Sequence, residues 1–274
     1  MGGSHASRRV RVSLDRRLRL YESAVQQPVA EVLFLERAYR HGRGADAWPR
    51  TLREDFAGTS SVAAAWCRTD PDREAIAVES DRPTAAWAGQ YHHDLDTLYV
   101  VDDDVLNIHG PRVDVLAALN FSVLIWHDRP ALVRYLKHAR RCLRPDGVFV
   151  MDLFGGPGAT TIQTEDRPGH DDEGQPVMYR WEQRAHDPLT GRLDCRIHFR
   201  WDQAGSQREL RDAFVYDWRL WTIPELLDAI HEAGFIETNV WADDPQQPGR
   251  YAPVSQLDAS NARSAWVVYL TARR

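Results

Sequence analysis

The stretch Arg53-Glu54-Asp55-Phe56-Ala57-Gly58-Thr59-Ser60-Ser61 carries the main prediction of the fold. An acidic pair meets a turn of small residues, and the turn leads directly into a helix-forming run, Val62 to Cys67. Ala57 and Gly58 have almost no side chain, so a ligand can approach the backbone closely there. The start of the helix directs N–H groups at the same place. The pattern therefore predicts a strand, a ligand-binding turn and a helix in succession.

A further carboxylate follows at a spacing that is typical of nucleotide-binding folds. The short apolar run Ala75-Ile76-Ala77-Val78 ends in Glu79, which lies 21 residues after Gly58. Nucleotide folds place a ribose-binding acid about 20 residues after such a turn. We therefore expect Glu79 to accept hydrogen bonds from the hydroxyls of a ribose.

Two stretches resemble class I S-adenosylmethionine-dependent methyltransferases. The loop is similar to their first motif, acid-x-Gly-x-Gly-x-Gly, of which the chain keeps the acid, as Glu54 or Asp55, and the single glycine Gly58. The string Leu143-Arg144-Pro145-Asp146-Gly147-Val148-Phe149-Val150 closely resembles the Leu-Lys-Pro-Gly-Gly stretch before their fifth strand. Taken alone, the loop also fits an ordinary strand-to-helix turn; the second stretch strongly favours the family.

The resemblance implies an α/β fold with a Rossmann-like seven-stranded methyltransferase sheet, mostly parallel with an antiparallel last strand. The continuous apolar run at 113–122 is typical of a strand buried on both faces of a parallel sheet. Two closing strands, at 235–241 and 265–271, have no helix between them and predict an antiparallel pair at the sheet edge. Residues 242–262 between them are predicted to be a long polar loop.

The alternating, aromatic-rich segment after the fifth strand predicts an inserted antiparallel β meander, a lid at about residues 160–220. Residues 161–176 are polar and acidic and are predicted to be a loop. The domain organisation expected is an N-terminal helical cap at 1–45 and a methyltransferase domain at 46–274 that contains the lid.

The resemblance implies S-adenosylmethionine as the cofactor and assigns its site to the carboxyl ends of the strands, where ligands of open α/β sheets bind. Asp104 and Val105 match the position that contacts the adenine amino group, and Asn120 matches the fourth motif. Tyr21 and Gln26 lie in an N-terminal segment of the kind that, in this family, often covers the cofactor, although Tyr21 also fits a packed core residue. The cofactor-binding residues predicted are Tyr21, Gln26, Asp55, Ala57, Gly58, Glu79, Asp104, Val105 and Asn120.

The lid and the segment that follows it supply candidates for binding the methyl acceptor. Trp181, His198, Tyr216 and Arg219 stand out because aromatic and cationic residues are dense there. Arg219 could hold a carboxylate or phosphate of the acceptor in bidentate fashion, or it could simply pair with Asp217. His198 could act as a base if the acceptor must lose a proton, or it could be a structural histidine. Arg219 and His198 are thus the catalytic candidates, and Trp181, Tyr216 and Arg219 the substrate-binding ones.

Bulk composition narrows the function further. The chain has 274 residues with 34 basic and 40 acidic side chains, a net charge of −6, which argues against a nucleic-acid partner. No apolar run reaches the roughly 20 residues that cross a bilayer, and no signal peptide is recognisable. Three separated cysteines, at 67, 142 and 195, predict reduced thiols in a cytoplasmic protein without a metal site. The acidic run at 102–104 is predicted to be a solvated loop.

The function predicted is in-line methyl transfer from S-adenosylmethionine to a small-molecule acceptor. A nicotinamide-dependent oxidoreductase and a non-catalytic nucleotide-binding protein are the alternatives. The missing Gly-x-Gly-x-x-Gly and the terminal strand pair argue against the oxidoreductase. The aromatic lid argues against the binding protein. The identity of the acceptor and the oligomeric state stay open at this point.

Overall fold

The structure, a computed structural model, describes residues 8–44, 46–244, 247–254 and 265–274. The chain forms two compact units, each built from two separate stretches of sequence. The first unit contains the residues up to Gln26 and Thr160–Leu220. The second unit contains Gln27–Ala159 and Trp221–Arg274. The segment 1–45, expected to form one cap, is therefore divided between the two units.

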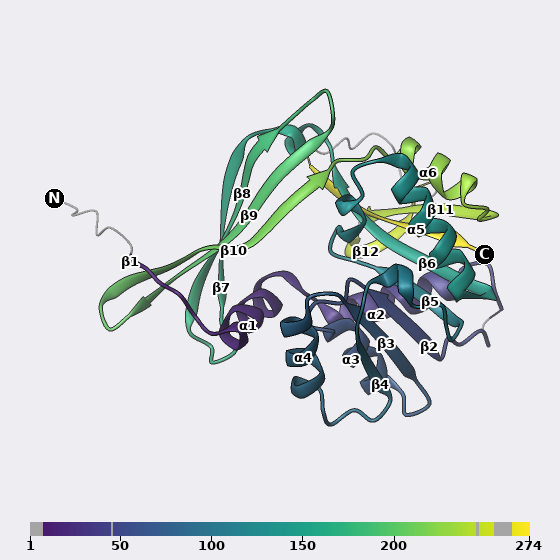
Figure 1. Ribbon diagram of the computed structural model, residues 1–274, viewed down its shortest axis with the longest axis horizontal. Helices are drawn as coiled ribbons and strands as arrows, with labels where there is room; N and C mark the ends of the chain where they lie inside the picture. The colour runs from purple at the N-terminus through teal and green to yellow at the C-terminus, as the bar shows by residue number, and fades with distance from the viewer. Residues whose placement is uncertain (1–7, 45, 245–246, 255–264) are drawn as a thin grey trace. The chain divides into compact units, whose positions relative to one another are not determined.

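The second unit is an α/β layer structure (Figure 1). Its strands are β2 (Thr51–Asp55), β3 (Glu74–Glu79), β4 (Leu98–Asp102), β5 (Val113–Ala118), β6 (Leu143–Gly155), β11 (Glu237–Asp244), β12 (Gln247–Pro253) and β13 (Trp266–Arg273). Its helices are α2 (Pro28–Arg40), α3 (Ser61–Thr69), α4 (Arg82–Tyr91), α5 (Arg129–Cys142) and α6 (Ile223–Glu232). The short 3₁₀ helices η1 (Val105–Asn107), η2 (Ser122–Ile125) and η3 (Pro157–Thr160) follow β4, β5 and β6.

The sheet of this unit has the predicted Rossmann-like topology. Its strand order is β12-β11-β13-β6-β5-β2-β3-β4. The four pairings that join β4, β3, β2, β5 and β6 are parallel, whereas β13 pairs antiparallel with both β6 and β11. The antiparallel closing pair is therefore confirmed, in the form of β11 and β13.

An eighth strand corrects the prediction of a long loop at 242–262. Asp244 still belongs to β11, and Gln247–Pro253 forms β12, which pairs antiparallel with β11 at the sheet edge. The prolines and the glycine of this stretch hide the strand in the sequence, and an edge strand tolerates proline because only one side of it must pair. The remainder of the predicted loop, 245–246 and 255–262, lies outside the described residues.

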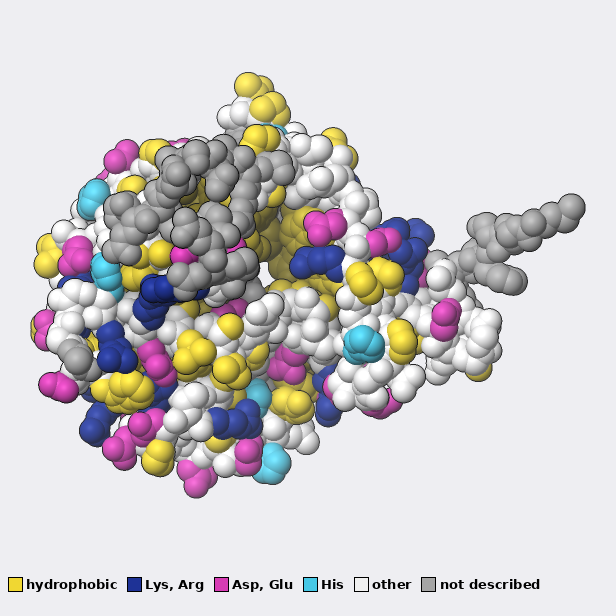
Figure 2. Space-filling model, turned by 180° about the vertical axis from the view of Figure 1, so that it is seen from behind, with side chains coloured by type: hydrophobic (Ala, Val, Ile, Leu, Met, Phe, Trp, Pro, Cys, Tyr) yellow, Lys and Arg dark blue, Asp and Glu magenta, His cyan; other side chains and the backbone are white. Residues whose placement is uncertain are grey.

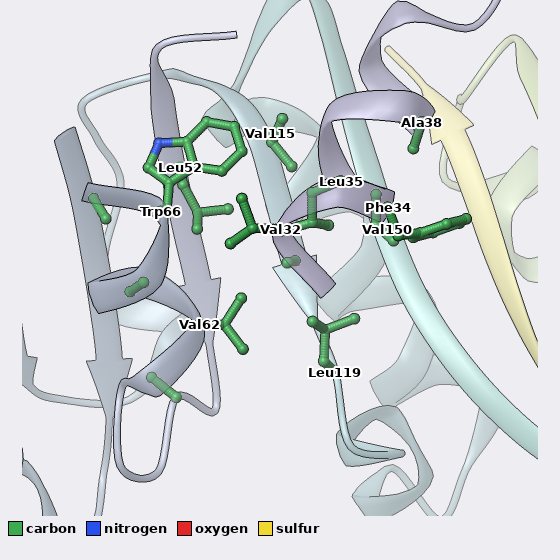
Figure 3. Packing of buried hydrophobic residues seen from close by; sticks show 14 of the residues in the cluster. Val32, Phe34, Leu35, Ala38, Leu52, Val62, Trp66, Val115, Leu119 and Val150 are labelled. Carbon is green, nitrogen blue, oxygen red and sulfur yellow. The ribbon is translucent and has the colours of Figure 1, made fainter. Parts of the chain in front are cut away.

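The core of the second unit lies between the sheet and α2 and α3. Figure 3 shows Val32 and Leu35 of α2 pointing at side chains of the strands and of α3, among them Val115 and Val62. These four side chains are at most 1% exposed. Fully burying one such side chain contributes about 1.5–3 kcal/mol, so this contact holds α2 on the sheet.

Three helices of the unit begin in the same way. Asp81, Asp128 and Thr222 precede α4, α5 and α6, and each side chain accepts a hydrogen bond from a backbone N–H of the first turn. A proline follows in the first turn of each helix, where its missing N–H is not needed. These caps fix the residue at which each helix starts.

The first unit is a five-stranded sheet with one helix packed on it. Its elements are β1 (Arg8–Arg9), α1 (Leu14–Val25), β7 (Gln163–His170), β8 (Pro176–His186), β9 (Arg192–Gln203) and β10 (Ser206–Arg219). The strand order is β1-β10-β9-β8-β7, and the strands pair antiparallel except β1, which runs parallel to β10. Leu20 of α1 packs in a cluster with Tyr179, Ile197 and Phe199 of the sheet.

Strand β7 corrects the prediction of a loop at 161–176. It pairs with β8 along its whole length, from Gln163 opposite Gln183 to His170 opposite Pro176. Its side chains are nearly all exposed, so the sequence shows no alternation of apolar and polar residues. Charged residues and Pro168 are typical of an edge strand, because they discourage pairing with another chain.

The surface carries charges of both signs. Figure 2 shows basic and acidic side chains interspersed over one face of the molecule. Among the described residues, no helix is both long enough and apolar enough to span a membrane.

Candidate active site

The loop after β2 adopts a backbone that L-residues usually avoid. Phe56, Gly58 and Ser60 have φ values of 58°, 52° and 59°. Counted from Glu54 as the acid, these are the three glycine positions of acid-x-Gly-x-Gly-x-Gly. A left-handed conformation costs a non-glycine residue about 1–2 kcal/mol, so the surroundings must stabilise it at Phe56 and Ser60. The loop thus has the conformation of a three-glycine motif although it contains one glycine.

Backbone and side-chain hydrogen bonds hold this loop. The Ala57 N–H donates to the carbonyl of Val78 at 3.0 Å, which ties the loop to β3. The Ser60 N–H donates to the Ala57 carbonyl at 2.8 Å and closes the turn. From α4, Nε2 of the buried His92 lies 3.0 Å from the Thr59 carbonyl oxygen. The loop is therefore tied to β3 and to the end of α4.

Glu79 lies directly beside the turn, as its spacing predicts. Its Oε2 accepts a hydrogen bond from the Gly58 N–H at 2.8 Å, and its Oε1 accepts one from the Asp81 N–H at 2.7 Å. A Cβ placed on Gly58 would meet no heavy atom within 4 Å. Open space over Gly58 and a half-buried carboxylate beside it are what a ribose passing close to the backbone requires.

Asp55, predicted to bind the cofactor, is part of a buried ion pair. It is 0% exposed, with Oδ1 2.6 Å from Nε of Arg53 and Oδ2 accepting from the Tyr135 hydroxyl at 3.0 Å. Arg53 also donates to the carbonyls of Val105 and Ile108. Asp55 is thus held by two side chains of the protein, and Arg53 fixes the segment that follows β4; a contact of Asp55 with a cofactor stays a prediction.

Glu54 points to the other face of the sheet, since successive residues of a strand alternate. It is 2% exposed, and its Oε2 accepts from the Ala63 N–H of α3 at 2.8 Å. Glu54 lies two residues before the first of the three left-handed positions, which is the spacing of the acid in acid-x-Gly-x-Gly-x-Gly.

Two further carboxyls face the same side and were missed in the sequence. Asp152 of β6 is 7% exposed, and Glu31 in the first turn of α2 is half-buried with a buried Oε2 that has no hydrogen-bond partner. We call Glu31, Glu54 and Asp152 the carboxyl trio. Within the described part of the chain, none of the three forms an ion pair with a basic residue.

Burial raises the pKa of every member of the trio. The pKa rises to about 8 for Glu54 and to about 7 for Asp152, in both cases mainly by loss of solvent. The pKa of Glu31 rises to about 8, first through burial and then through the charge of Asp152. The charge of Glu31 in turn adds to the rise at Glu54. Such a group of carboxyls favours a positively charged ligand, which would relieve both effects.

The positions of Glu31 and Asp152 within the apolar pattern of α2 and β6 would have predicted that both are buried. Glu31 precedes Leu35 by one helical turn and Ala38 by two, and both of these are buried. Asp152 alternates with Val148 and Val150, both 0% exposed. An acid that follows the apolar period of a helix or strand is expected to be buried.

The end of β5 has a second strained turn, supported by Asp152. Asn120 and Phe121 have φ values of 57° and 60°. Their N–H groups donate to the two carboxylate oxygens of Asp152, at 3.0 and 2.7 Å. Asn120 thus lies at the carboxyl edge of the sheet, where its motif predicts it, and its backbone is fixed by Asp152.

Asp104 and Val105 also lie at this edge. Asp104 is exposed and caps η1 by accepting from the Leu106 N–H at 2.8 Å. Val105 is buried, and its carbonyl accepts from Arg53 at 2.8 Å. Among the described residues, no group of three His, Cys, Asp or Glu side chains is arranged to hold a metal ion.

The structure does not bring the four acceptor candidates of the first unit together. Trp181 and Tyr216 share one face of its sheet, with ring centroids 6.1 Å apart, and Trp218 stacks on Tyr216 at 4.3 Å. His198 is directly opposite Arg180 in the register, and Arg219 is three residues from Tyr216. Both therefore point to the other face of the sheet.

The surroundings of His198 are those of a structural residue. It is 5% exposed, its Nε2 lies 2.9 Å from Oε2 of Glu182, and its Nδ1 accepts from the Asp212 N–H at 2.9 Å. With both ring nitrogens engaged, His198 has no nitrogen left to take a proton from an acceptor.

The two N-terminal candidates belong to α1 and its end. Tyr21 packs against Phe214 with centroids 4.7 Å apart. Gln26 is the C-cap residue of α1, and its N–H donates to the Glu22 carbonyl. These contacts lie within the first unit, so a role of either residue toward a cofactor remains a proposal.

Two solved structures with the same architecture are similar to this chain in sequence only at a low level. Streptomyces venezuelae DesVI is 17% identical with a TM-score of 0.70, over 94% of this chain and 99% of that chain. CalS10, an amino pentose methyltransferase from Micromonospora echinaspora solved with S-adenosylmethionine bound, is 15% identical with a TM-score of 0.68, over 93% and 95%. The fold is that of a class I S-adenosylmethionine-dependent methyltransferase.

A third structure with this methyltransferase fold matches over the whole chain. It is the sugar N-methyltransferase KedS8 from a Streptoalloteichus species, 19% identical with a TM-score of 0.66, over 100% of this chain and 98% of that chain. No protein-family profile and no curated protein sequence matches the chain.

Proposed function

We propose that the protein is an S-adenosylmethionine-dependent methyltransferase that acts on a small-molecule acceptor. The observation that carries the proposal is the loop of residues 54–61, with its glycine-type backbone at three alternate positions and Glu79 bonded to its turn. Glu79 would accept hydrogen bonds from the ribose diol, while Ala57 and Gly58 would line the methionine side. Asp104 and Val105 would flank the adenine, and Asn120 the reacting edge.

The carboxyl trio supports this cofactor over a nicotinamide dinucleotide. S-adenosylmethionine carries a positive sulfonium and a positive ammonium, whereas the dinucleotide carries a negatively charged pyrophosphate. Three carboxyls without a basic partner among the described residues would repel the pyrophosphate and attract the sulfonium compound. The missing Gly-x-Gly-x-x-Gly points the same way.

The cofactor supplies an activated methyl group, and the chain would supply position and protection from water. In-line displacement needs the nucleophile aligned with the methyl group, and alignment alone can contribute several kcal/mol. Trp181 and Tyr216 are the proposed acceptor-binding residues, with Arg219 as a proposed contact for an acidic group. The printed names of KedS8 and CalS10, a sugar N-methyltransferase and an amino pentose methyltransferase, favour an amine on a small polar molecule as the acceptor.

A thermal-shift comparison on the full chain tests the cofactor. S-adenosylhomocysteine and S-adenosylmethionine are expected to raise the melting temperature, whereas NAD and NADP are expected to leave it unchanged. Stabilisation by NAD or NADP alone would favour the oxidoreductase. Formation of S-adenosylhomocysteine from S-adenosylmethionine in the presence of small amines, followed by mass spectrometry, then separates an enzyme from a binding protein.

A further inference from the structure

Glu31, in the first turn of α2, buries a carboxyl oxygen that no hydrogen bond satisfies. Its Oε2 has no donor among the described residues, and no basic side chain of that part of the chain forms an ion pair with it. Burial raises the pKa of Glu31 to about 8, and the backbone N–H of Gln27 offsets only part of this effect. A buried polar atom without a partner is costly, so this oxygen indicates a donor that arrives with a ligand.

A series of packed side chains places Glu31 close to Asp152. Phe34 follows Glu31 by three residues on the same face of α2, and its ring stacks on that of Tyr269 with centroids 4.0 Å apart. Tyr269 of β13 lies directly opposite Asp152 of β6 in the antiparallel register, so the two side chains share one face of the sheet. Burial raises the pKa of both Glu31 and Tyr269, and the charge of Asp152 raises both further, as expected for neighbouring groups.

Glu54 lies on this same face of the sheet. Glu54, Ala117 and Val150 are in register on neighbouring parallel strands, and Asp152 is two residues beyond Val150, so its side chain points to the same side. The pKa of Glu54 is raised first by burial and then, among the charges, most by Glu31. Glu31 therefore acts on both other carboxyls of the trio, the acid before the loop of residues 54–61 and the acid that supports the strained turn after β5.

The donor that fits Oε2 of Glu31 is a cation with N–H groups. A neutral donor would satisfy the oxygen but would leave the carboxyl trio without a counter-charge. The sulfonium of S-adenosylmethionine has the charge but no N–H, so it cannot donate a hydrogen bond to this oxygen. An ammonium group has both the charge and three N–H donors.

We infer that Glu31 binds the α-ammonium group at the methionine end of S-adenosylmethionine and S-adenosylhomocysteine. The inference rests on the proposed function, in which Ala57 and Gly58 line the methionine side of the same site. Both compounds carry this group, and an ammonium forms charge-assisted hydrogen bonds with a carboxylate. Glu31 thus fixes the end of the ligand that lies beyond the ribose proposed to bind Glu79.

Two ligands that differ only at this group test the inference on the full chain. The probes are S-adenosylhomocysteine and its deamino analogue, in which hydrogen replaces the α-amino group, and both are titrated by calorimetry at one pH and ionic strength. The parent is expected to prefer S-adenosylhomocysteine by about tenfold or more, because the analogue lacks the charge-assisted hydrogen bond. Glu31→Gln keeps the size of the side chain but removes its charge, so this preference should fall to about threefold or less. Glu74→Gln, which changes an exposed acid of β3, is the matched control and should keep the preference of the parent.

The melting temperature without ligand separates a binding defect from unfolding. Glu31→Gln is expected to melt no lower than the parent; if it does melt lower, Glu31→Asp, which keeps the charge on a shorter side chain, takes its place and should show an intermediate preference. The inference alone is overturned if the parent binds the two ligands alike, or if the variant at Glu31 keeps the full preference of the parent. If neither S-adenosylhomocysteine nor S-adenosylmethionine binds the parent, the proposed function is overturned and this inference with it.

Discussion

Glu54 and Asp55 are neighbours in sequence, but they face two differently charged sides of the same sheet. On the α5 side, Asp55 has Arg53 at 2.6 Å and the Tyr135 hydroxyl at 3.0 Å, so its charge is neutralised within the protein. On the α2 side, Glu54 joins Glu31 and Asp152 with no ion pair to a basic residue of the described chain. The ion pair on the α5 side thus stabilises the fold, whereas the carboxyls on the α2 side favour a positively charged ligand.

The largest effect is expected on the neutralised side. Arg53→Met leaves Asp55 buried without its counter-charge and frees the carbonyls of Val105 and Ile108, so unfolding should become easier by about 3–5 kcal/mol. Urea denaturation measures it. The double variant Arg53→Met/Asp55→Asn should recover part of the loss, because it removes the unpaired charge. A single variant as stable as the parent would mean that this ion pair has no structural role.

The next effect separates the ligand from the fold. Gly58→Val should abolish S-adenosylmethionine binding in calorimetry, because its branched side chain fills the open space over the turn. The protein should still fold, at a cost of about 1–2 kcal/mol for a left-handed valine. Gly205→Val is the matched control, since Gly205 also has positive φ and no atom near its Cβ position, but lies in a hairpin of the first unit. Equal binding by both variants would exclude the loop as the site.

A smaller effect is expected at the ribose. Glu79→Ala should weaken cofactor binding by about tenfold or more, since it removes charge-assisted hydrogen bonds of about 1.5–3 kcal/mol each. Glu74→Ala, an exposed acid of the same strand, is the control for the loss of one negative charge. Affinities are compared by calorimetry at one ionic strength. Unchanged affinity in the Glu79 variant would contradict the assignment.

The smallest effect is expected at Glu31, on the α2 side of the sheet, as a change in the pH dependence of stability. The pKa of Glu31 is raised from its ordinary value of 4.5 to about 8, so the folded cofactor-free protein keeps a proton that the unfolded chain releases. The contribution of Glu31 to stability is then present below about pH 4.5 and is lost as the pH rises to about 8. Glu31→Gln should therefore raise the melting temperature at pH 8 by about 3 °C, and change it less at pH 4.5.

Melting curves of the parent, Glu31→Gln and Glu74→Gln between pH 4.5 and 8.5 measure this difference. Glu74→Gln, which changes an exposed acid, should follow the parent at every pH. If Glu31→Gln also follows the parent, Glu31 titrates normally and does not belong to a charged side.

The sheet of the second unit could be predicted because its inner strands are apolar runs and because glycine and proline residues indicate the turns between elements. Val113–Ala118 is buried on both faces, which a continuous apolar run announces. β7 and β12 could not be predicted in this way, since edge strands bury little and their sequences show no period. Pairing with a neighbour, rather than local propensity, makes them strands.

The candidate site was predicted less evenly than the fold. The contact between Glu79 and Gly58 could be predicted from their spacing, because the two residues follow or end neighbouring parallel strands, β2 and β3. His198 and Arg219 were grouped with Trp181 and Tyr216 by proximity in sequence, although a strand alternates its side chains. His198 lies one residue from the buried Phe199, and Arg219 three residues from Tyr216, so the period of two separates them. Asp55 was predicted in place of Glu54 because the hydrogen bond between Asp55 and Tyr135 becomes visible only in the fold.

The backbone of residues 56–60 bears on how such loops are found. Its handedness reverses at every second residue, and only one of the three reversed positions is a glycine. A search for a glycine motif in the sequence therefore misses this loop, and no protein-family profile matches the chain. A search for the order of left- and right-handed residues after a buried strand would find it. The sign of φ along the loop is then a better criterion for such nucleotide-binding loops than the residue types. Residues as different as phenylalanine and serine can adopt a positive φ when their surroundings enforce it.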